Sequence, residues 1–212
     1  NIIVVSDHSK YGFENTVWTG QDQNTQQPAE LKLNVPVTSV NYPVKTYTDL
    51  PELPITLDYD FNFLAVAQYG PRKNLNNTIK WFVEEFQDEE VGLVLKTNLM
   101  KNCLMDREQV KNQVTQLVRS LPEHKCKIYL LHGDMTDEEM HALYRHPQMK
   151  AFLALPHGEG FGLPIFEAAY TGLPVVATGW SGQLDFLCDE DGNEHFYNVA
   201  FDLAPVQKEV VW

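Results

Sequence analysis

The stretch AFLALPHGEGFGLPIFEAAYTGLPVVA, residues 151–177, decides the fold of this 212-residue chain. It opens on an unbroken apolar run, which predicts a buried strand, and a glycine-rich loop follows. Pro164 suits the first turn of a helix, so the pattern predicts a helix over residues 164–170 that Gly172 ends. The apolar residues 175–177 form the next strand. A buried strand, a loop, a helix and a second buried strand make the repeating unit of a parallel sheet.

The same alternation extends in both directions along the chain. Short apolar runs predict strands, and apolar residues at intervals of three and four predict helices. Thr136 begins one of these helices, because Glu139 completes a capping box with it. The other expected helices cover residues 75–86, 107–121, 164–170 and 182–187, and the expected strands cover residues 61–67, 91–95, 127–131, 151–155, 175–177 and 196–201. We therefore predict an α/β fold, a doubly wound, Rossmann-like parallel sheet with helices on both faces.

The beginning of the chain has a different pattern. Residues 2–5 predict one short strand, and Ser6 is a candidate N-cap for a helix over residues 7–13. Residues 19–30 are polar and rich in glutamine, a composition typical of a linker. An edge strand is expected within residues 35–44, where apolar and polar residues alternate loosely between prolines.

Charge and cysteine usage limit the function of the chain. Sixteen Lys and Arg against 29 Asp and Glu give a net charge of −13. Such a chain repels a phosphate backbone, which excludes nucleic-acid binding as its main function. No apolar stretch approaches the roughly 20 residues of a membrane-spanning helix, so no transmembrane segment is expected. The three cysteines are scattered and never form C-x-x-C, which favours reduced thiols and a cytoplasmic location.

The glycine-rich loop at residues 157–163 is the candidate binding site. Ligands of doubly wound sheets bind at the carboxyl ends of the strands, where this loop lies. Its glycines let the backbone approach a ligand closely, and the free amides at the start of the helix favour an anion such as phosphate. Glu167 follows in the same helix, and its two carboxylate oxygens suit a vicinal diol such as that of ribose.

Two other interpretations begin from these residues. In the first, the glycines form an ordinary tight turn, and Glu167 only stabilises its own helix by interacting with the helix dipole. The other is a dinucleotide-binding fingerprint, which needs an acidic residue about 20 positions on, at the end of the next strand. Residues 177–180 contain no acid, which argues against that fingerprint.

Residues 159–177 resemble the signature of the group 1 family of retaining nucleotide-sugar glycosyltransferases, which have the two-domain GT-B fold. The family carries two glutamates separated by seven residues, and Glu159 and Glu167 match this pair. The resemblance extends upstream, because residues 63–75 (FLAVAQYGPRKNL) are similar to the family's strand and diphosphate-binding loop.

The upstream match includes one departure. Lys73 stands where the family has its diphosphate-binding lysine, but Gln68 stands where the family has an arginine. Arg72, or Lys96 at the end of the next strand, is a candidate substitute for that missing cation.

The resemblance implies a role for each candidate residue. Glu159 and Lys73 would be catalytic, the first contacting the sugar and the second neutralising the diphosphate of the leaving group. No metal and no cofactor are implied besides the nucleotide-diphosphate sugar itself, and the Asp-x-Asp sequences at residues 58–60 and 189–191 are expected to be turns. The resemblance assigns substrate binding to Glu167, Gly160, Phe161, Gly162, Leu163, Gln68, Arg72, Lys96 and Met135. Met135 belongs to a loop that is expected to form the wall of the subsite for the nucleotide base.

The resemblance also implies a division of the chain. Residues 35–212 match the donor-binding domain, and residues 1–34 resemble the last strand and helix of the acceptor-binding domain followed by a linker. The expected partners are a nucleotide sugar and a missing N-terminal acceptor-binding domain, so the chain alone would be an incomplete enzyme. The implied function is transfer of a hexose from a nucleotide-diphosphate sugar to an unknown acceptor. A non-catalytic nucleotide-sugar binding module, which Gln68 favours, and a nucleotide-sugar epimerase remain as alternatives.

Overall fold

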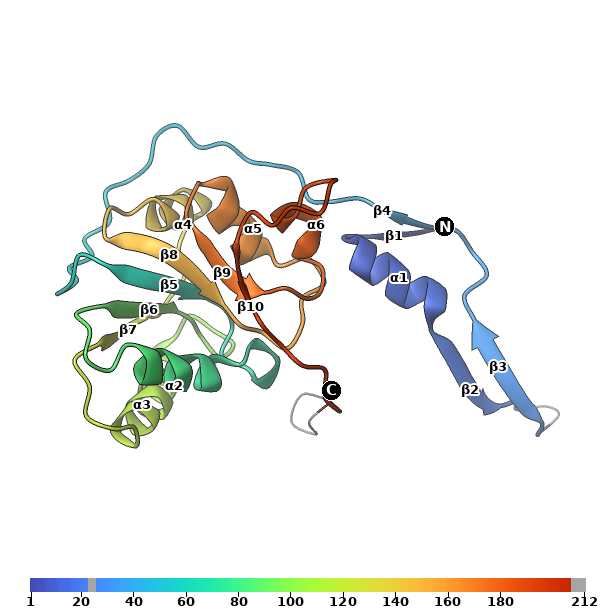
Figure 1. Ribbon diagram of the computed structural model, residues 1–212, viewed down its shortest axis with the longest axis horizontal. Coiled ribbons are helices and arrows are strands. Elements are labelled where there is room, and N and C mark those ends of the chain that lie inside the picture. The colour runs from blue at the N-terminus through green and yellow to red at the C-terminus, as the bar shows by residue number, and fades with distance from the viewer. Residues whose placement is uncertain (23–25, 207–212) are drawn as a thin grey trace.

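The computed structural model describes residues 1–22 and 26–206, and its centre is a parallel sheet. Six strands lie in the order β10-β9-β8-β5-β6-β7, and all neighbours run parallel (Figure 1). The doubly wound α/β prediction is confirmed. The strands are β5 (Asn62–Val66), β6 (Gly92–Lys96), β7 (Lys127–Leu131), β8 (Met149–Ala154), β9 (Val175–Thr178) and β10 (Tyr197–Val199).

Helices cover both faces of this sheet (Figure 1). Successive side chains of a strand point to opposite faces, so Leu64 packs in the core beneath α4 and α5 while Ala65 packs beneath α2 and α3. Among the described residues, no helix combines the length and the apolar composition that crossing a membrane requires. The helices are α2 (Leu75–Glu85), α3 (Leu104–Arg119), α4 (Asp137–Tyr144), α5 (Leu163–Tyr170) and the short α6 (Leu184–Leu187).

The direction of winding reverses between β5 and β8. From β5 the chain moves outward through β6 to β7, then returns to β8 on the other side of β5 and continues through β9 to β10. The loops that follow β5 and β8 therefore flank the reversal at the carboxyl edge of the sheet. Ligands of open α/β sheets bind at this point, because the two loops diverge there and leave a crevice.

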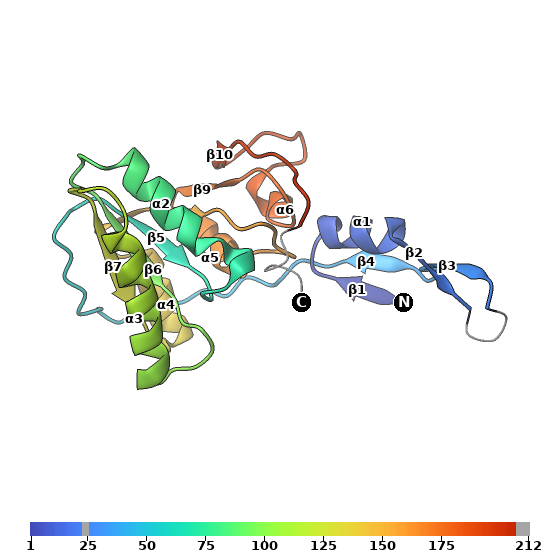
Figure 2. The same cartoon turned by 90° about the horizontal axis from the view of Figure 1, so that it is seen from below.

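A smaller unit precedes the sheet and lies beside it (Figure 2). In this unit β1 (Ile2–Val4) pairs in parallel with β4 (Val37–Ser39), and α1 (Asp7–Asn15) packs against them. Ser6 caps α1 as predicted, because its hydroxyl accepts the N–H of Ser9 at 3.1 Å. The expected edge strand thus shortens to β4 and belongs to this unit rather than to the main sheet.

The prediction of a linker over residues 19–30 is wrong. The described part of this segment contributes to an antiparallel hairpin of β2 (Val17–Gln21) and β3 (Pro28–Lys32), and residues 23–25 lie outside the description. Both strands are largely exposed, so the hairpin needs no buried apolar face and its composition resembles that of a linker. The other predicted elements are present, most of them with ends shifted by a few residues, and β7 has the predicted bounds. The division at residue 34 stays a prediction, and the last six residues of the expected main domain, 207–212, are not described.

Gly92 at the start of β6 gives a test of the sheet packing. A Cβ there would lie 2.0 Å from Oδ1 of the fully buried Asn62 and 2.7 Å from the Tyr129 ring. We expect Gly92→Ala to lower the free energy of unfolding by about 1–3 kcal/mol, because neighbours must shift in a packed core. Urea denaturation measures this. Gly12→Ala is the control, since nothing lies within 4 Å of its added Cβ, and equal stability of both variants would contradict the described packing.

Candidate functional site

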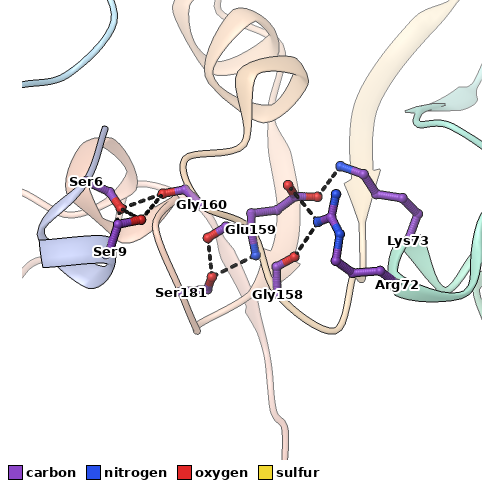
Figure 3. Close-up of polar contacts among 8 residues, drawn as sticks. All are labelled: Ser6, Ser9, Arg72, Lys73, Gly158, Glu159, Gly160 and Ser181. Atoms are coloured by element: carbon purple, nitrogen blue, oxygen red, sulfur yellow. Dashed lines mark hydrogen bonds and ion pairs between the residues drawn. The ribbon is translucent and has the colours of Figure 1, made fainter. Parts of the chain in front are cut away.

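The two loops at the reversal bring one carboxylate and two cations together (Figure 3). After β5 the chain forms a short 3-10 helix, η1 (Pro71–Lys73), which presents Arg72 and Lys73. The loop after β8 presents Glu159, whose side chain is only 10% exposed. Its Oε1 accepts a hydrogen bond from Lys73 Nζ, and its Oε2 lies 3.2 Å from Arg72 Nη1. Within this cluster one positive charge remains unmatched, which favours an anionic ligand.

Backbone contacts join the same two loops. Arg72 Nη1 also donates to the Gly158 carbonyl at 2.7 Å, and the His157 N–H donates to the Arg72 carbonyl at 2.9 Å. Arg72 was predicted as a substitute for the cation that Gln68 replaces. The structure brings it into the cluster, whereas Gln68 donates its amide to the Leu99 carbonyl.

Ser181 and Gly182 hold the glycine-rich loop in place. The segment 179–187 that contains them also resembles the family's loop after the next strand, but the sequence did not indicate these contacts. The Ser181 hydroxyl accepts the Glu159 N–H at 2.7 Å and donates to the Glu159 carbonyl, which also accepts the Gly182 N–H at 3.0 Å. A Cβ on residue 182 would lie 2.1 Å from the Gly160 carbonyl oxygen, so only glycine fits there. The Ser-Gly pair just before a short helix was the available signal.

Residues from the smaller unit hold the other side of this loop. Ser6 is fully buried, and its hydroxyl donates to the Gly160 carbonyl, which also accepts the Ser9 hydroxyl at 3.3 Å. The Asp7 N–H donates to Asp185 Oδ2 at 2.9 Å. The first turn of α1 therefore contacts both the loop of Glu159 and the segment that supports it. The sequence predicted the cap at Ser6 but not this contact.

Glu167 lies on a different side of α5 from the cluster. Gly162 precedes α5 with a φ of 92°, a left-handed value that favours glycine. Glu167 lines a pocket of about 300 Å³ between α4, α5 and residues 42–47, and this pocket shares no lining residue with the one around Lys73. The buried Tyr144 donates its hydroxyl to Glu167 Oε2 at 2.9 Å, while desolvation raises the pKa of the Glu167 carboxyl.

The remaining predicted residues are distributed around this centre. Leu163 lines the Glu167 pocket, Phe161 is buried against neighbouring aromatic rings, and Met135 packs against the core on the α4 and α5 face. Lys96 donates to the Gly133 carbonyl, and burial lowers the pKa of its ammonium group. Met135 and Lys96 therefore make their contacts away from Glu159.

Residues 1–22 and 26–206 contain no group of three or more His, Cys, Asp or Glu side chains arranged to hold a metal ion. Asp58, in the first Asp-x-Asp sequence, pairs instead with Lys127 at 2.9 Å and accepts the Tyr129 hydroxyl at 2.9 Å. Asp189, in the second, accepts hydrogen bonds from Asn193 in an exposed turn.

Comparison with known families identifies the family of this chain. A sequence model of the glycosyl transferases group 1 family matches residues 57–198. The chain belongs to this family. Two Escherichia coli proteins named serotype-specific mannosyltransferase WbdA are 30% identical to it over 118 residues, which is 54% of this chain and 13% and 12% of theirs. The chain thus matches only a small part of the length of these curated relatives.

Solved structures agree on the fold of this group 1 glycosyltransferase chain. Sucrose-phosphate synthase from Thermosynechococcus elongatus superposes with a TM-score of 0.58 and 16% identity, covering 87% of this chain and 42% of that one. The apo structure of OtsA gives 0.56 and 11% identity, covering 92% and 48%. At identities this low, the superpositions show a shared fold and nothing about function. The six-stranded sheet is accordingly a Rossmann-like half of a GT-B architecture.

The charge balance of the cluster predicts how it responds to a small anion. Glu159→Gln removes the carboxylate that competes for Lys73 and Arg72, so we expect pyrophosphate to bind this variant about 3- to 10-fold more tightly. Lys73→Ala should weaken the same binding. Isothermal titration calorimetry with pyrophosphate measures both. A Glu159→Gln variant that binds no more tightly than the wild type would show that the cations do not face the ligand.

Proposed function

We propose that this chain is the donor-binding domain of a retaining glycosyltransferase that transfers a hexose from a nucleotide-diphosphate sugar to an acceptor. The observation that carries the proposal is the position of the two glutamates around the start of α5. Glu159 shares one side with Lys73 and Arg72, and Glu167 lines a pocket on the other side. Because the chain belongs to a glycosyltransferase family, we interpret these residues as a site for sugar transfer.

A nucleotide-diphosphate sugar has the charge pattern that fits these two sides. Its diphosphate needs cations and amide donors, and Lys73, Arg72 and the start of α5 offer them. Its ribose carries a vicinal diol, which can donate to both oxygens of Glu167. We assign the sugar and its phosphate to the loop formed by Gly160, Phe161, Gly162 and Leu163, so the donor crosses the start of α5.

The reaction exchanges one bond at the anomeric carbon. The acceptor oxygen forms a bond to that carbon, the bond to the diphosphate oxygen breaks, and the nucleoside diphosphate leaves while the acceptor gives up its proton. Negative charge grows on the diphosphate in the transition state, so a fixed lysine there lowers the barrier. Lys73 takes this role, and Glu159 keeps it in place through their ion pair.

The finer parts of the proposal have their own support. The two Escherichia coli relatives are named mannosyltransferases, which favours a hexose donor. Retention of configuration follows from the resemblance of residues 159–177 to the retaining group. We assign binding of the acceptor to a separate acceptor-binding domain. That domain would hold the acceptor beside the donor, and positioning both reactants supplies much of the rate. A cytoplasmic location remains a proposal that rests on cysteine usage.

Glu167 gives the sharpest test of nucleotide binding. Its carboxylate would accept charge-assisted hydrogen bonds from the ribose, so we expect Glu167→Ala to cost about 2–4 kcal/mol of nucleotide affinity, very roughly 30- to 700-fold. Glu167→Gln keeps one acceptor and should lose less. Calorimetric titration with nucleoside diphosphates, together with melting curves, measures both variants. Unchanged affinity in a folded Glu167→Ala protein would assign the carboxylate to the helix alone.

Metal removal tests the proposed chemistry separately. If Lys73 and Arg72 neutralise the leaving group, chelation by EDTA should leave donor binding and any sugar transfer unchanged. Transfer is measured as nucleoside diphosphate release, and proton NMR of the product reports the anomeric configuration. Loss of transfer on chelation that Mg²⁺ restores would overturn metal independence, and an inverted product would overturn retention.

A further inference from the structure

Residues 42–47, named here the strap, form the outer wall of the Glu167 pocket. In Figure 1 the segment between β4 and β5 passes over the side of the sheet that α4 and α5 cover. Tyr42, Lys45 and Tyr47 line the pocket together with Asp137 and His141 from α4. One wall therefore comes from the strap and the opposite wall from the helices. The loop of Met135, which was expected to wall the base, does not line this pocket.

Two strap side chains are anchored on one carboxylate. Lys45 Nζ lies 2.7 Å from Asp137 Oδ2, and the Tyr47 hydroxyl donates to the same oxygen at 3.0 Å. These contacts hold the pKa of Asp137 below its ordinary value, chiefly through the hydrogen bond from Lys45. The Tyr47 ring lies 5.3 Å from the His141 ring, centroid to centroid, at an interplanar angle of 56°. The pocket thus has a pair of aromatic rings beside a charged anchor.

The ion pair that anchors the strap on α4 is weak, because both of its side chains are exposed. The side chains of Lys45 and Asp137 are 68% and 64% exposed, and water screens such ion pairs so that they contribute little to stability. Thr46 adds a contact to the Tyr170 hydroxyl at 3.1 Å, which is also exposed. Besides the ring contacts of Tyr42 and Tyr47, the strap is held on the helices by these exposed polar contacts, so it can separate from them at low cost. It can therefore admit a ligand and then cover it.

We propose that the strap is a movable wall of the base subsite, and that Tyr47 with His141 receives the planar base of the donor nucleotide. This rests on the proposed function, because it takes the Glu167 pocket as the ribose position. A base attached to that ribose extends toward the strap and α4, where a flat heteroaromatic ring can stack on Tyr47. Lys45 and Asp137 then face the polar edge of the base.

The strap also connects this subsite to the rest of the molecule. It begins three residues after β4 ends, and the Tyr42 ring lies 5.2 Å from the ring of Phe161 in the glycine-rich loop. The smaller unit is therefore connected to the base subsite through the strap, and to the loop of Glu159 through the contact of Ser6 with Gly160.

The chain contains a matched control for the anchor. Lys127, Asp58 and Tyr129 form a second triad of the same chemistry, with an exposed ion pair in which Lys127 Nζ lies 2.9 Å from Asp58 Oδ2, and this triad does not line the Glu167 pocket. Calorimetric titration with UDP, GDP, ADP, CDP and dTDP compares both sites. We expect Tyr47→Ala to weaken the tightest nucleotide about 5- to 100-fold and Lys45→Ala about 2- to 5-fold, while Lys127→Ala binds as the wild type does.

Limited trypsin digestion gives a second readout, because Lys45 lies within the strap. The bound nucleotide should slow cleavage after Lys45 and leave cleavage after the exposed Lys32 unchanged. Wild-type affinity in both strap variants, with Glu167→Ala still defective, would overturn the strap inference and leave the proposed function intact. A wild-type chain that binds none of the five nucleotides would overturn the proposed function itself.

Discussion

The pairing of Glu159 with Lys73 and Arg72 is the interaction on which the site depends. Like charges on a 3-10 helix repel one another, and a nearly buried carboxylate is costly unless it is paired. The carboxylate therefore offsets the repulsion between the two cations, and the cations offset the cost of burying the carboxylate. The reversal of strand order makes this pairing possible, because it places the loops after β5 and β8 side by side although Lys73 and Glu159 stand 86 residues apart.

Local patterns in the sequence were sufficient for the main sheet. Apolar runs marked the strands, and the capping box of Thr136 and Glu139 marked the start of α4. Composition misled at the β2–β3 hairpin, where exposed backbone pairing needs no buried face. The glycine-rich loop was recognisable because its chemistry lies within one short segment. The contact between Ser181 and Glu159 was not recognisable, since the two residues stand 22 positions apart in the sequence with a complete helix and strand between them.

The two glutamates illustrate what a motif leaves open. Their spacing in sequence indicates a common ligand, but it says nothing about the side of α5 on which each carboxylate lies. In the structure Glu159 lies in the loop and faces Lys73, Glu167 lies in the helix and accepts the Tyr144 hydroxyl, and Gly162 with its left-handed φ stands between them in the chain. A donor that reaches both glutamates must cross the start of α5. The geometry thus favours an elongated ligand over a compact one.

The strand order also has a consequence for how the chain folds. The strands β5, β6 and β7 are joined by single helices and can assemble from neighbouring parts of the chain. The central pair of β5 with β8 joins residue 62 to residue 149, and closing so long a loop costs entropy before any contact repays it. Until β8 arrives, β5 presents an open edge at the middle of the future sheet. The edge that completes the binding crevice is therefore also the one most exposed to wrong partners during folding.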